Sequence, residues 1–311
     1  MTSVAKHQES AALHWLRQAS RHWRLYTLIL PGLFTVYLFH YVPIYGLQIA
    51  FRNYRPSKGI WGSVWVGLEH FRHFFTYPGF WVIIINTLSV SLYSLATFPC
   101  AVILALMINE IQSHRYKRYV QLISYAPHFV STVIVCSMVV LFTQYSNGLF
   151  NNVLAALGRP RMDFITVPRY FSSIYVWSGV WQNIGWDTII YLAALAGVSP
   201  ELLEAARIDG AGRLQIVRRV TFPCILPTVI TMLILSTGRV LSVGFEKVFL
   251  LQNSLNMDAS RVISTYVYEI GIQGGQFSYS AAIGLFNNVV NIAFIVIVNQ
   301  VAKRLTSVGL W

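Results

Sequence analysis

The side chains best suited to chemistry lie inside long apolar stretches, where polar groups are costly and usually serve a purpose. In the stretch 171–197, several tryptophans accompany amides and a carboxylate. Ring faces stack on the C–H faces of sugars, while amides and carboxylates bond hydroxyl groups, so this combination suits a polyhydroxylated ligand. At 3.6 residues per turn, one side of a helix would carry Asn183, Trp186 and Asp187, and a neighbouring side Trp177 and Trp181.

A structural interpretation of the same residues is equally open. Tryptophans are enriched where a spanning helix meets the lipid headgroups. Asp187 could pair with a basic group on a neighbouring helix. The sequence does not decide between a ligand-binding wall and an interfacial belt of tryptophans.

A basic residue occupies the stretch 225–249. Arg239 lies near its middle, and an unpaired arginine at that depth costs at least about 2.5 kcal/mol. We therefore predict that Arg239 faces a cavity, a carboxylate such as Asp187, or an acidic sugar.

Another polar stripe follows in the stretch 279–301. Asparagines recur there at helical spacing, at positions 287, 288 and 291. Asparagine hydrogen bonds between spanning helices average less than about 1 kcal/mol, so stability alone is a weak reason for three of them. Asn287, Asn288 and Asn291 are candidates for a substrate pathway, with helix packing as the alternative.

We expect no catalytic residue and no metal site in this chain. The sequence has no Gly-x-x-x-x-Gly-Lys-Ser/Thr loop for binding phosphates, so the chain is not expected to hydrolyse ATP. No acids, bases and nucleophile gather at one membrane depth, as a membrane enzyme would need, and the histidines lack metal-ligand spacing. Three cysteines, Cys100, Cys136 and Cys224, provide no disulfide framework.

The elements that must position these residues are membrane-spanning helices. Of the 311 residues, 55% are hydrophobic and 11% charged, and the mean hydropathy is +0.55. A soluble domain of this composition could not cover its surface with polar groups. A spanning helix needs about 20 mostly apolar residues. Six stretches meet this need, at 25–50, 82–109, 119–144, 171–197, 225–249 and 279–301.

The sequence thus predicts an all-α polytopic membrane protein with six transmembrane helices. A segment 1–24 precedes one membrane domain, 25–311. Basic residues concentrate in the segments before the first helix, between the second and third, between the fourth and fifth, and after the last, which predicts that these segments and both termini are cytoplasmic. The net charge of +12 is spread over both faces, so we expect no nucleic-acid partner. The aromatic-rich segment 52–80, with Phe74 among its rings, is expected to lie at headgroup depth outside.

The loop at about 198–224 has strong local signals. Ser199 and Pro200 are typical of a helix start, and Glu201 suits its positive end. That helix should end near Asp209, because Gly210 permits a sharp turn. A second helix should follow and end at Pro223.

The residues of this loop resemble a known family. Glu204-Ala205-Ala206, Asp209-Gly210 and Phe222-Pro223 are similar to the EAA loop in the membrane-spanning subunits of binding-protein-dependent ABC importers, with Phe222 where leucine is usual. The likeness extends to Ser124-Tyr125-Ala126-Pro127 and to the terminal Gly309-Leu310-Trp311. It is closest to the carbohydrate branch that takes oligosaccharides derived from polysaccharides, alginate among them.

The resemblance implies an oligosaccharide permease of the bacterial cytoplasmic (inner) membrane that works by alternating access. Its partners would be a second permease subunit, two ATPase subunits that bind ATP and Mg, an external solute-binding protein, the oligosaccharide and membrane lipid, while this chain would bind no cofactor. The residues expected to couple to an ATPase are Glu201, Glu204, Ala205, Ala206, Asp209, Gly210 and Ala211.

Three other functions remain as alternatives. They are an ABC permease for another solute, a secondary transporter and, much less favoured, a polytopic membrane enzyme. A secondary transporter would usually show internal repeats or paired glycine-broken helices, and neither is evident.

Overall fold

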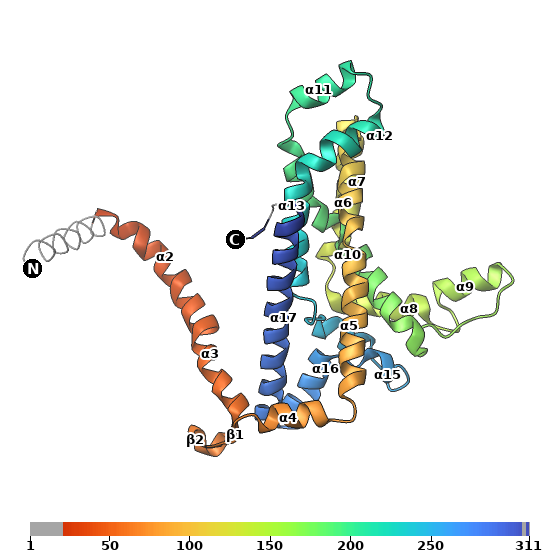
Figure 1. Cartoon of the computed structure of the whole chain (residues 1–311). Helices are drawn as coiled ribbons and strands as arrows, with labels where there is room; N and C mark the ends of the chain where they lie inside the picture. Colours follow the sequence, from red (N-terminus) through yellow and green to blue (C-terminus); the bar gives the residue numbers. More distant parts are fainter. Residues whose placement is uncertain (1–20, 307–308, 311) are drawn as a thin grey trace, which may run out of the picture. The chain divides into compact units, whose positions relative to one another are not determined.

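The computed structural model describes residues 21–306 and 309–310, and its contacts divide the chain into two units (Figure 1). The N-terminal unit ends at Gly67, and the C-terminal unit begins at Leu68. Most of the predicted segment 1–24 lies outside the described residues, as does Trp311.

The N-terminal unit begins with one apolar helical run. α2 (Trp23–Val36) continues through a π-helical turn (Tyr37–Tyr41), α3 (Val42–Gly46) and a 3-10 turn (Leu47–Phe51). The 29 residues coincide with the predicted stretch 25–50 and are apolar enough to cross a membrane. No residue of α2 is buried.

The same unit ends in a β-hairpin that the all-helical prediction missed. β1 (Arg52–Arg55) pairs antiparallel with β2 (Gly59–Trp65) across a 3-10 turn, Pro56–Lys58. The Arg52 guanidinium lies 5.5 Å from the ring centroid of Trp61 and 5.4 Å from that of Trp65. Cation–π contacts therefore join the two strands.

The C-terminal unit opens with α4 (Glu69–Thr76), where one expectation is wrong. Phe74 does not lie at a headgroup surface but is 1% exposed, in a core with Phe80, Ile83 and Tyr266. The reason is that α4 packs against α17 (Phe277–Thr306), so its inner face is enclosed by protein.

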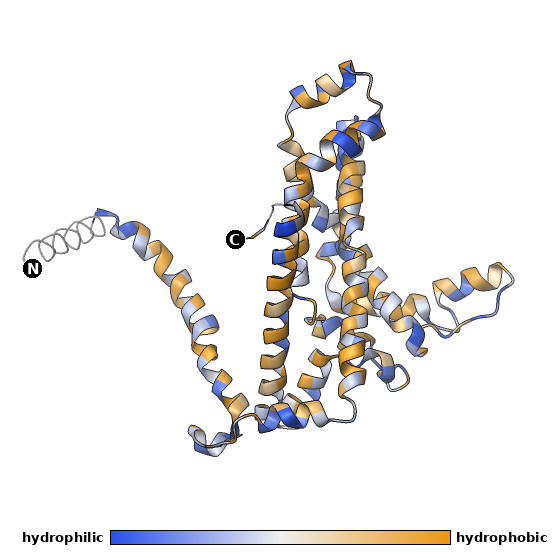
Figure 2. Cartoon of the chain, viewed as in Figure 1, coloured by the Kyte–Doolittle hydropathy of each residue, from blue (hydrophilic) through white to orange (hydrophobic). Residues whose placement is uncertain are grey.

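Hydropathy follows the long helices closely (Figure 2). Within the described residues, four helical runs are long and apolar enough to cross a membrane, at 23–51, 80–109, 213–237 and 277–304. The run 80–109 consists of α5 (Phe80–Ala96) and α6 (Pro99–Asn109). The number rises to six if each of two bent helix pairs forms one span.

The first bent pair replaces the predicted continuous helix 119–144. α7 (His114–Tyr125) and a 3-10 turn (Ala126–Phe129) meet α8 (Thr132–Thr143) at 97°. Ser131 starts α8 by accepting a hydrogen bond from the N–H of Ile134 at 3.4 Å. α9 (Leu149–Ala156) follows, tied down by Asn151, which donates to the carbonyl of Met162 at 2.9 Å.

α10 (Pro168–Ala196) lies at the centre of this unit and contacts α5, α6, α7, α8 and α13. At Gly185 an added Cβ would collide with the backbone of Ser124, so the end of α7 packs directly on the α10 backbone. A second core, with Ala105, Tyr191 and Ile225, joins α6, α10 and α13.

Beyond α10 the chain forms α11 (Pro200–Ile208), α12 (Arg213–Ile216), a π-helical turn (Val217–Thr221) and α13 (Phe222–Thr237). The prediction that Pro223 ends a helix is wrong, because 213–237 is one helical run. The π-helical turn ends one residue before Phe222-Pro223, so the hydrogen-bond spacing changes close to the position where the proline lacks an N–H.

The prediction of one continuous helix over 225–249 is also wrong, because the structure interrupts it. α13 ends at Thr237, residues 238–244 are irregular, and α14 (Phe245–Leu251) follows. A tertiary contact explains the interruption: Asn291 Oδ1 accepts from the N–H of Leu241, and its Nδ2 donates to Ser242 Oγ, both at 2.9 Å.

The chain then runs through three short helical elements to α17. They are α15 (Met257–Ser260), α16 (Ile263–Tyr268) and a π-helical turn (Glu269–Gln273). Arg261 pairs with Glu269 at 2.6 Å in this region. Near the C-terminus, Asn299 Oδ1 accepts from the N–H of Leu310 at 2.8 Å.

Candidate functional site

The loop at about 198–224 folds as a helix, a glycine turn and a second helix. Ser199 Oγ caps α11 by accepting from the N–H of Glu201 at 3.2 Å. At the other end, Gly210 adopts φ +78°, and the Ala211 N–H donates to the Ala206 carbonyl at 2.9 Å. A glycine enters this left-handed conformation without penalty, so α11 ends where the sequence predicts.

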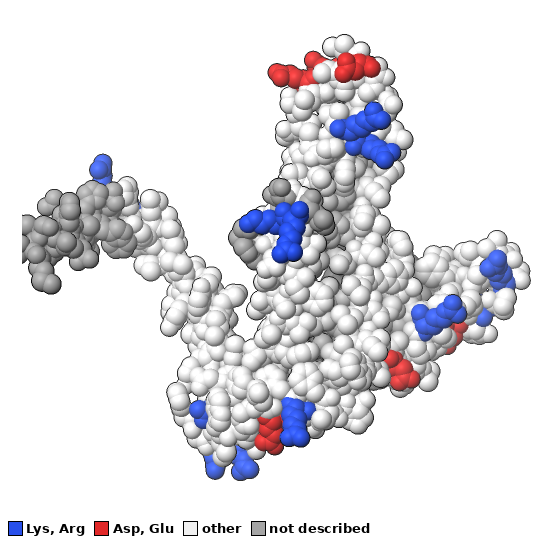
Figure 3. Space-filling model, viewed as in Figure 1, with Lys and Arg blue, Asp and Glu red and all other residues white. Residues whose placement is uncertain are grey.

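The surface of this loop offers both charge and apolar area. Acidic side chains cover α11, and basic ones lie over α12 (Figure 3). Leu202, Ile208 and Leu214 are exposed among them, Ile208 by 85% and Leu214 by 80%. Exposed apolar side chains ringed by charges are typical of a surface that binds another protein. Of the predicted coupling residues, Glu201, Glu204, Ala205, Asp209 and Gly210 are exposed, and Ala206 and Ala211 are partly exposed.

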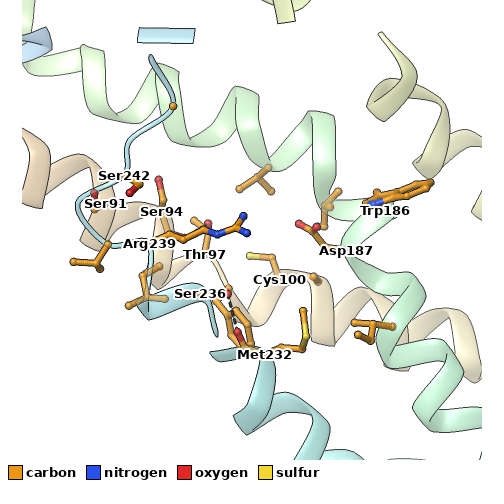
Figure 4. Close-up of a pocket in the computed structure, with 18 of the residues that line it drawn as sticks. Ser91, Ser94, Thr97, Cys100, Trp186, Asp187, Met232, Ser236, Arg239 and Ser242 are labelled. Carbon is orange, nitrogen blue, oxygen red and sulfur yellow. Dashed lines mark hydrogen bonds between the residues drawn. The ribbon is translucent and has the colours of Figure 1, made fainter. Parts of the chain in front are cut away.

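A cavity of about 790 Å³ lies in the C-terminal unit, between α5, α6, α10, α13 and the irregular segment 238–244. Trp186, Asp187 and Arg239 line it. The side chains of Asp187 and Arg239 point toward one another across the space (Figure 4). The two side chains do not form an ion pair with one another. Arg239 therefore faces a cavity that it shares with Asp187.

Small polar groups complete this wall. Hydroxyl groups and a thiol line the cavity around the two charged side chains (Figure 4), and such groups suit a ligand rich in hydroxyls. They belong to Ser91, Ser94, Thr97, Cys100, Ser236 and Ser242.

A second chamber, of about 450 Å³, adjoins the first and is lined by Asn183, Asp187, Glu246 and Lys247. The two chambers share part of their wall, including Asp187 and Tyr175. Both volumes fall in the range of about 300–1,000 Å³ that is typical of small-molecule sites.

Trp186 is held by the bend between α7 and α8. Its ring stacks on His128, with centroids 4.3 Å apart and planes at 7°. His128 Nδ1 also lies 2.9 Å from Asn183 Oδ1, in hydrogen-bonding contact. Trp186 thus uses one ring face for a contact inside the protein, while the residue as a whole stays 43% exposed.

The other two predicted tryptophans do not line either chamber. Trp177 is 52% exposed, and its Nε1 donates to Tyr93 Oη at 2.8 Å. Trp181 is 48% exposed. These placements agree with the alternative of interfacial tryptophans.

The predicted asparagines of α17 do not line the chambers either. Asn291 is buried and bonded to Leu241 and Ser242, which is helix packing. Asn287 Oδ1 is buried without a hydrogen-bond partner, and Asn288 is exposed.

Sequence reasoning missed Lys247 and Cys100. Both lie in apolar surroundings that gave no periodic signal, and only the tertiary fold brings them to a cavity. Among the described residues no three His, Cys, Asp or Glu side chains are placed to hold a metal ion. The three cysteines are free thiols.

Comparison with known proteins establishes the class. Residues 97–307 match the family described as binding-protein-dependent transport system inner membrane component. The chain belongs to this family, and it is a multi-pass inner-membrane component of a transport system.

Individual relatives cover nearly the whole chain. The polygalacturonan/rhamnogalacturonan transport system permease protein YteP of Bacillus subtilis (strain 168) is 41% identical over 92% of this chain and 90% of its own length. Protein LplB of the same organism is 40% identical over both full lengths.

Solved structures of a similar transporter support the same class. A chain in the crystal structure of a bacterial ABC transporter involved in the import of the acidic polysaccharide alginate is 40% identical, with a TM-score of 0.86 over 94% of this chain and 99% of that one. The same values hold for that transporter in complex with its alginate pentasaccharide-bound periplasmic protein.

Proposed function

We propose that this chain is the permease subunit of an ATP-driven ABC importer for oligosaccharides, among them acidic ones such as alginate fragments. The observation that carries the proposal is the 40% identity, over nearly the full length, to a chain of the alginate importer. The polygalacturonan relative favours the same substrate class, since polygalacturonan is a polymer of galacturonic acid.

The cavity chemistry supports this class of substrate. A uronic acid carries several hydroxyl groups and one carboxylate. Asp187 accepts hydrogen bonds only, and Arg239 donates only, so the two together suit such a sugar unit. The exposed face of Trp186 offers a surface on which the sugar ring stacks.

The proposed assembly has the partners that the resemblance implies. A second permease subunit and lipid cover the apolar surface of this chain, an external binding protein delivers the sugar, and two ATPase subunits bind ATP and Mg on the cytoplasmic side. This chain binds no cofactor and no nucleic acid. Both termini are cytoplasmic, on the side of α11.

Transport in this proposal is alternating access driven through α11. Glu201, Glu204, Ala205, Ala206, Asp209, Gly210 and Ala211 form the contact with an ATPase, and Ile208 adds apolar area to it. Because α11 lies between α10 and α13 in the chain, closure of the ATPases moves two helices that line the cavity.

The test uses the assembled complex with its binding protein in lipid vesicles. ATPase activity and uptake are measured with neutral maltooligosaccharides and with oligomers of alginate and galacturonate. Stimulation by an acidic oligomer is expected, and stimulation by no oligosaccharide contradicts the proposal. Replacing the phosphate-loop lysine of the ATPase subunits should abolish uptake, and persistent uptake would favour a secondary transporter.

A further inference from the structure

Lys247 is a buried cation in the wall of the smaller chamber. This lysine follows the irregular segment 238–244 and is only 8% exposed. Its Nζ donates to the Tyr175 carbonyl at 2.8 Å and lies 4.9 Å from the Tyr175 ring centroid. The ammonium is therefore anchored on α10.

α10 is shaped to receive this ammonium. Gly179 lies one turn along from Tyr175, and a Cβ added there would come within 3.1 Å of Lys247 Nζ. A bare Cα at this position leaves room for the charged group beside the helix. The site is thus built from both α10 and α14.

The charge of Lys247 is not neutralised within the described part of the chain. Lys247 forms no salt bridge there, so no carboxylate of the described residues lies within 4.0 Å of its Nζ. A buried ammonium without an anion is costly, and such groups are usually kept for a function. An ammonium has three donors, and the Tyr175 carbonyl occupies one.

The amides and the carboxylates of the chamber differ in whether they are already bonded within the protein. The Gln182 amide donates to the Val130 carbonyl at 3.0 Å, and the Asn183 amide is bonded to His128 and to the Gly179 carbonyl. Asp187 and Glu246 are exposed to the chamber and form no salt bridge. Two acceptor carboxylates and one buried cation remain for a ligand.

We propose that Lys247 binds a carboxylate of the transported sugar. The carboxylate of one uronic acid unit lies at Lys247 Nζ in the smaller chamber, and the hydroxyls of that unit donate to Asp187 or Glu246. Because the two acids oppose the cation, selectivity comes from the position of the charges and not from net attraction. This inference rests on the proposed function, since it assigns the acidic group of that same substrate.

The experiment compares charge variants of Lys247 in the assembled transporter with its binding protein. Lys247→Met removes the charge at similar length, and Lys247→Arg keeps it. The probes are trigalacturonate and its trimethyl ester, which has the same linkages without the charges. Both sugars are delivered by the same binding protein. For each sugar, the concentration at half-maximal uptake is therefore compared between variant and wild type, which removes any preference of the binding protein itself.

For Lys247→Met we expect the trigalacturonate concentration at half-maximal uptake to rise about tenfold or more, since a hydrogen bond to a charged group is lost. The value for the ester should change less than about twofold, and Lys247→Arg should retain most of the affinity for the acid. Equal effects on both sugars, or no effect on either, overturn the inference while leaving the proposed function intact. Uptake of neither sugar by the wild type overturns the inference, and uptake of no oligosaccharide at all overturns the proposed function as well.

A second variant tests the site without removing the lysine. Gly179→Ala places a methyl group against Nζ, whose side chain is flexible enough to yield. We expect the concentration at half-maximal uptake to rise for trigalacturonate alone, and to rise less than it does in Lys247→Met. If Lys247→Met fails to assemble, an unchanged trigalacturonate concentration at half-maximal uptake in Gly179→Ala contradicts the inference.

Discussion

Few side chains carry the chemistry of the cavity, and they differ in how far they are held by contacts within the protein. The Trp186 ring is fixed by its stack on His128, whereas Asp187 and Arg239 reach into open space without pairing. A ligand therefore meets one rigid ring face and two charged groups that can adapt. Rigid stacking should set the position of a sugar unit, and the charges its orientation.

This difference predicts the effect of alanine substitutions on α10. Trp186→Ala or Asp187→Ala should raise the sugar concentration needed for half-maximal stimulation of ATPase activity about tenfold, because a ring face or a charged hydrogen-bond partner is lost. Trp177→Ala is the matched control, since Trp177 lines neither chamber. An unchanged concentration dependence for Trp186→Ala and Asp187→Ala would assign both residues to packing.

The turn after α11 predicts a different defect. Gly210 has φ +78°, and a β-branched residue there is strained, so Gly210→Val should distort the turn and uncouple ATPase activity from uptake. Glu204→Lys should uncouple as well, by reversing a charge on the exposed face of α11. Membrane insertion should be normal in both variants.

The control for Gly210 is its neighbour Gly212. Gly212 has φ −70°, and an added Cβ would meet only Gln215, at 3.9 Å, so Gly212→Ala should couple normally. Normal coupling in Gly210→Val vesicles would contradict the role given to this turn.

At the scale of elements, the interruption between α13 and α14 shapes the cavity. Residues 238–244 leave the helical path because Asn291 on α17 offers hydrogen bonds to Leu241 and Ser242. The departure places Arg239 and Ser242 in the cavity wall and sends α14 toward α10. One buried amide thus positions two functional segments.

Asn291→Ala should therefore destabilise the protein. The Leu241 N–H would lose its partner in a buried site, which costs about 1–3 kcal/mol of unfolding free energy. Thermal unfolding of the purified complex measures the change. Asn288→Ala is the control, since Asn288 is exposed on the same helix, and an equal effect of the two substitutions would refute the role of Asn291.

The same elements show what the sequence could and could not predict. The start of α11 at Ser199 and its end at Gly210 depend on local capping and turn preferences, so they were predictable. The apolar stretches were found from hydropathy for the same local reason. The interruption at 238–244 and the bend at 126–131 depend on partners distant in sequence, Asn291 and Gln182, which no local pattern reveals.

The site residues divide in the same way. Asp187 and Arg239 could be singled out because a charge in an apolar stretch stands out by itself. Trp177 and Asn291 were singled out by helical spacing, yet both serve contacts within the protein. Lys247 could not be assigned to the cavity before the path of α14 was known.

Over the C-terminal unit as a whole, the cavity and the loop proposed to contact an ATPase are both connected to α10. The helix carries Asp187 near its middle, and the chain turns by 75° from α10 into α11. Motion of α11 therefore reaches the cavity wall without an intermediate element, as rigid-body coupling requires.

The proposed substrate cavity can be tested in the unmodified protein by labelling two of its cysteines. Cys100 lines the cavity, and Cys224 is exposed near the start of α13. A small thiol reagent should modify Cys100, and a bound acidic oligosaccharide should slow that reaction several-fold because the sugar fills the cavity. The rate at Cys224 should stay constant. Mass spectrometry of the labelled peptides measures both rates, and equal protection of the two thiols would count against a substrate cavity here.

The contact between Gly185 and the Ser124 backbone limits how this protein can change over generations. No residue with a side chain fits there unless two main chains move apart, so a selection for growth on the transported sugar should recover only glycine at this codon. Gly284 on α17 has open space around it and should accept alanine in the same selection. The permease can thus acquire new cargo by altering its cavity lining, while the crossing of α7 and α10 is inherited unaltered.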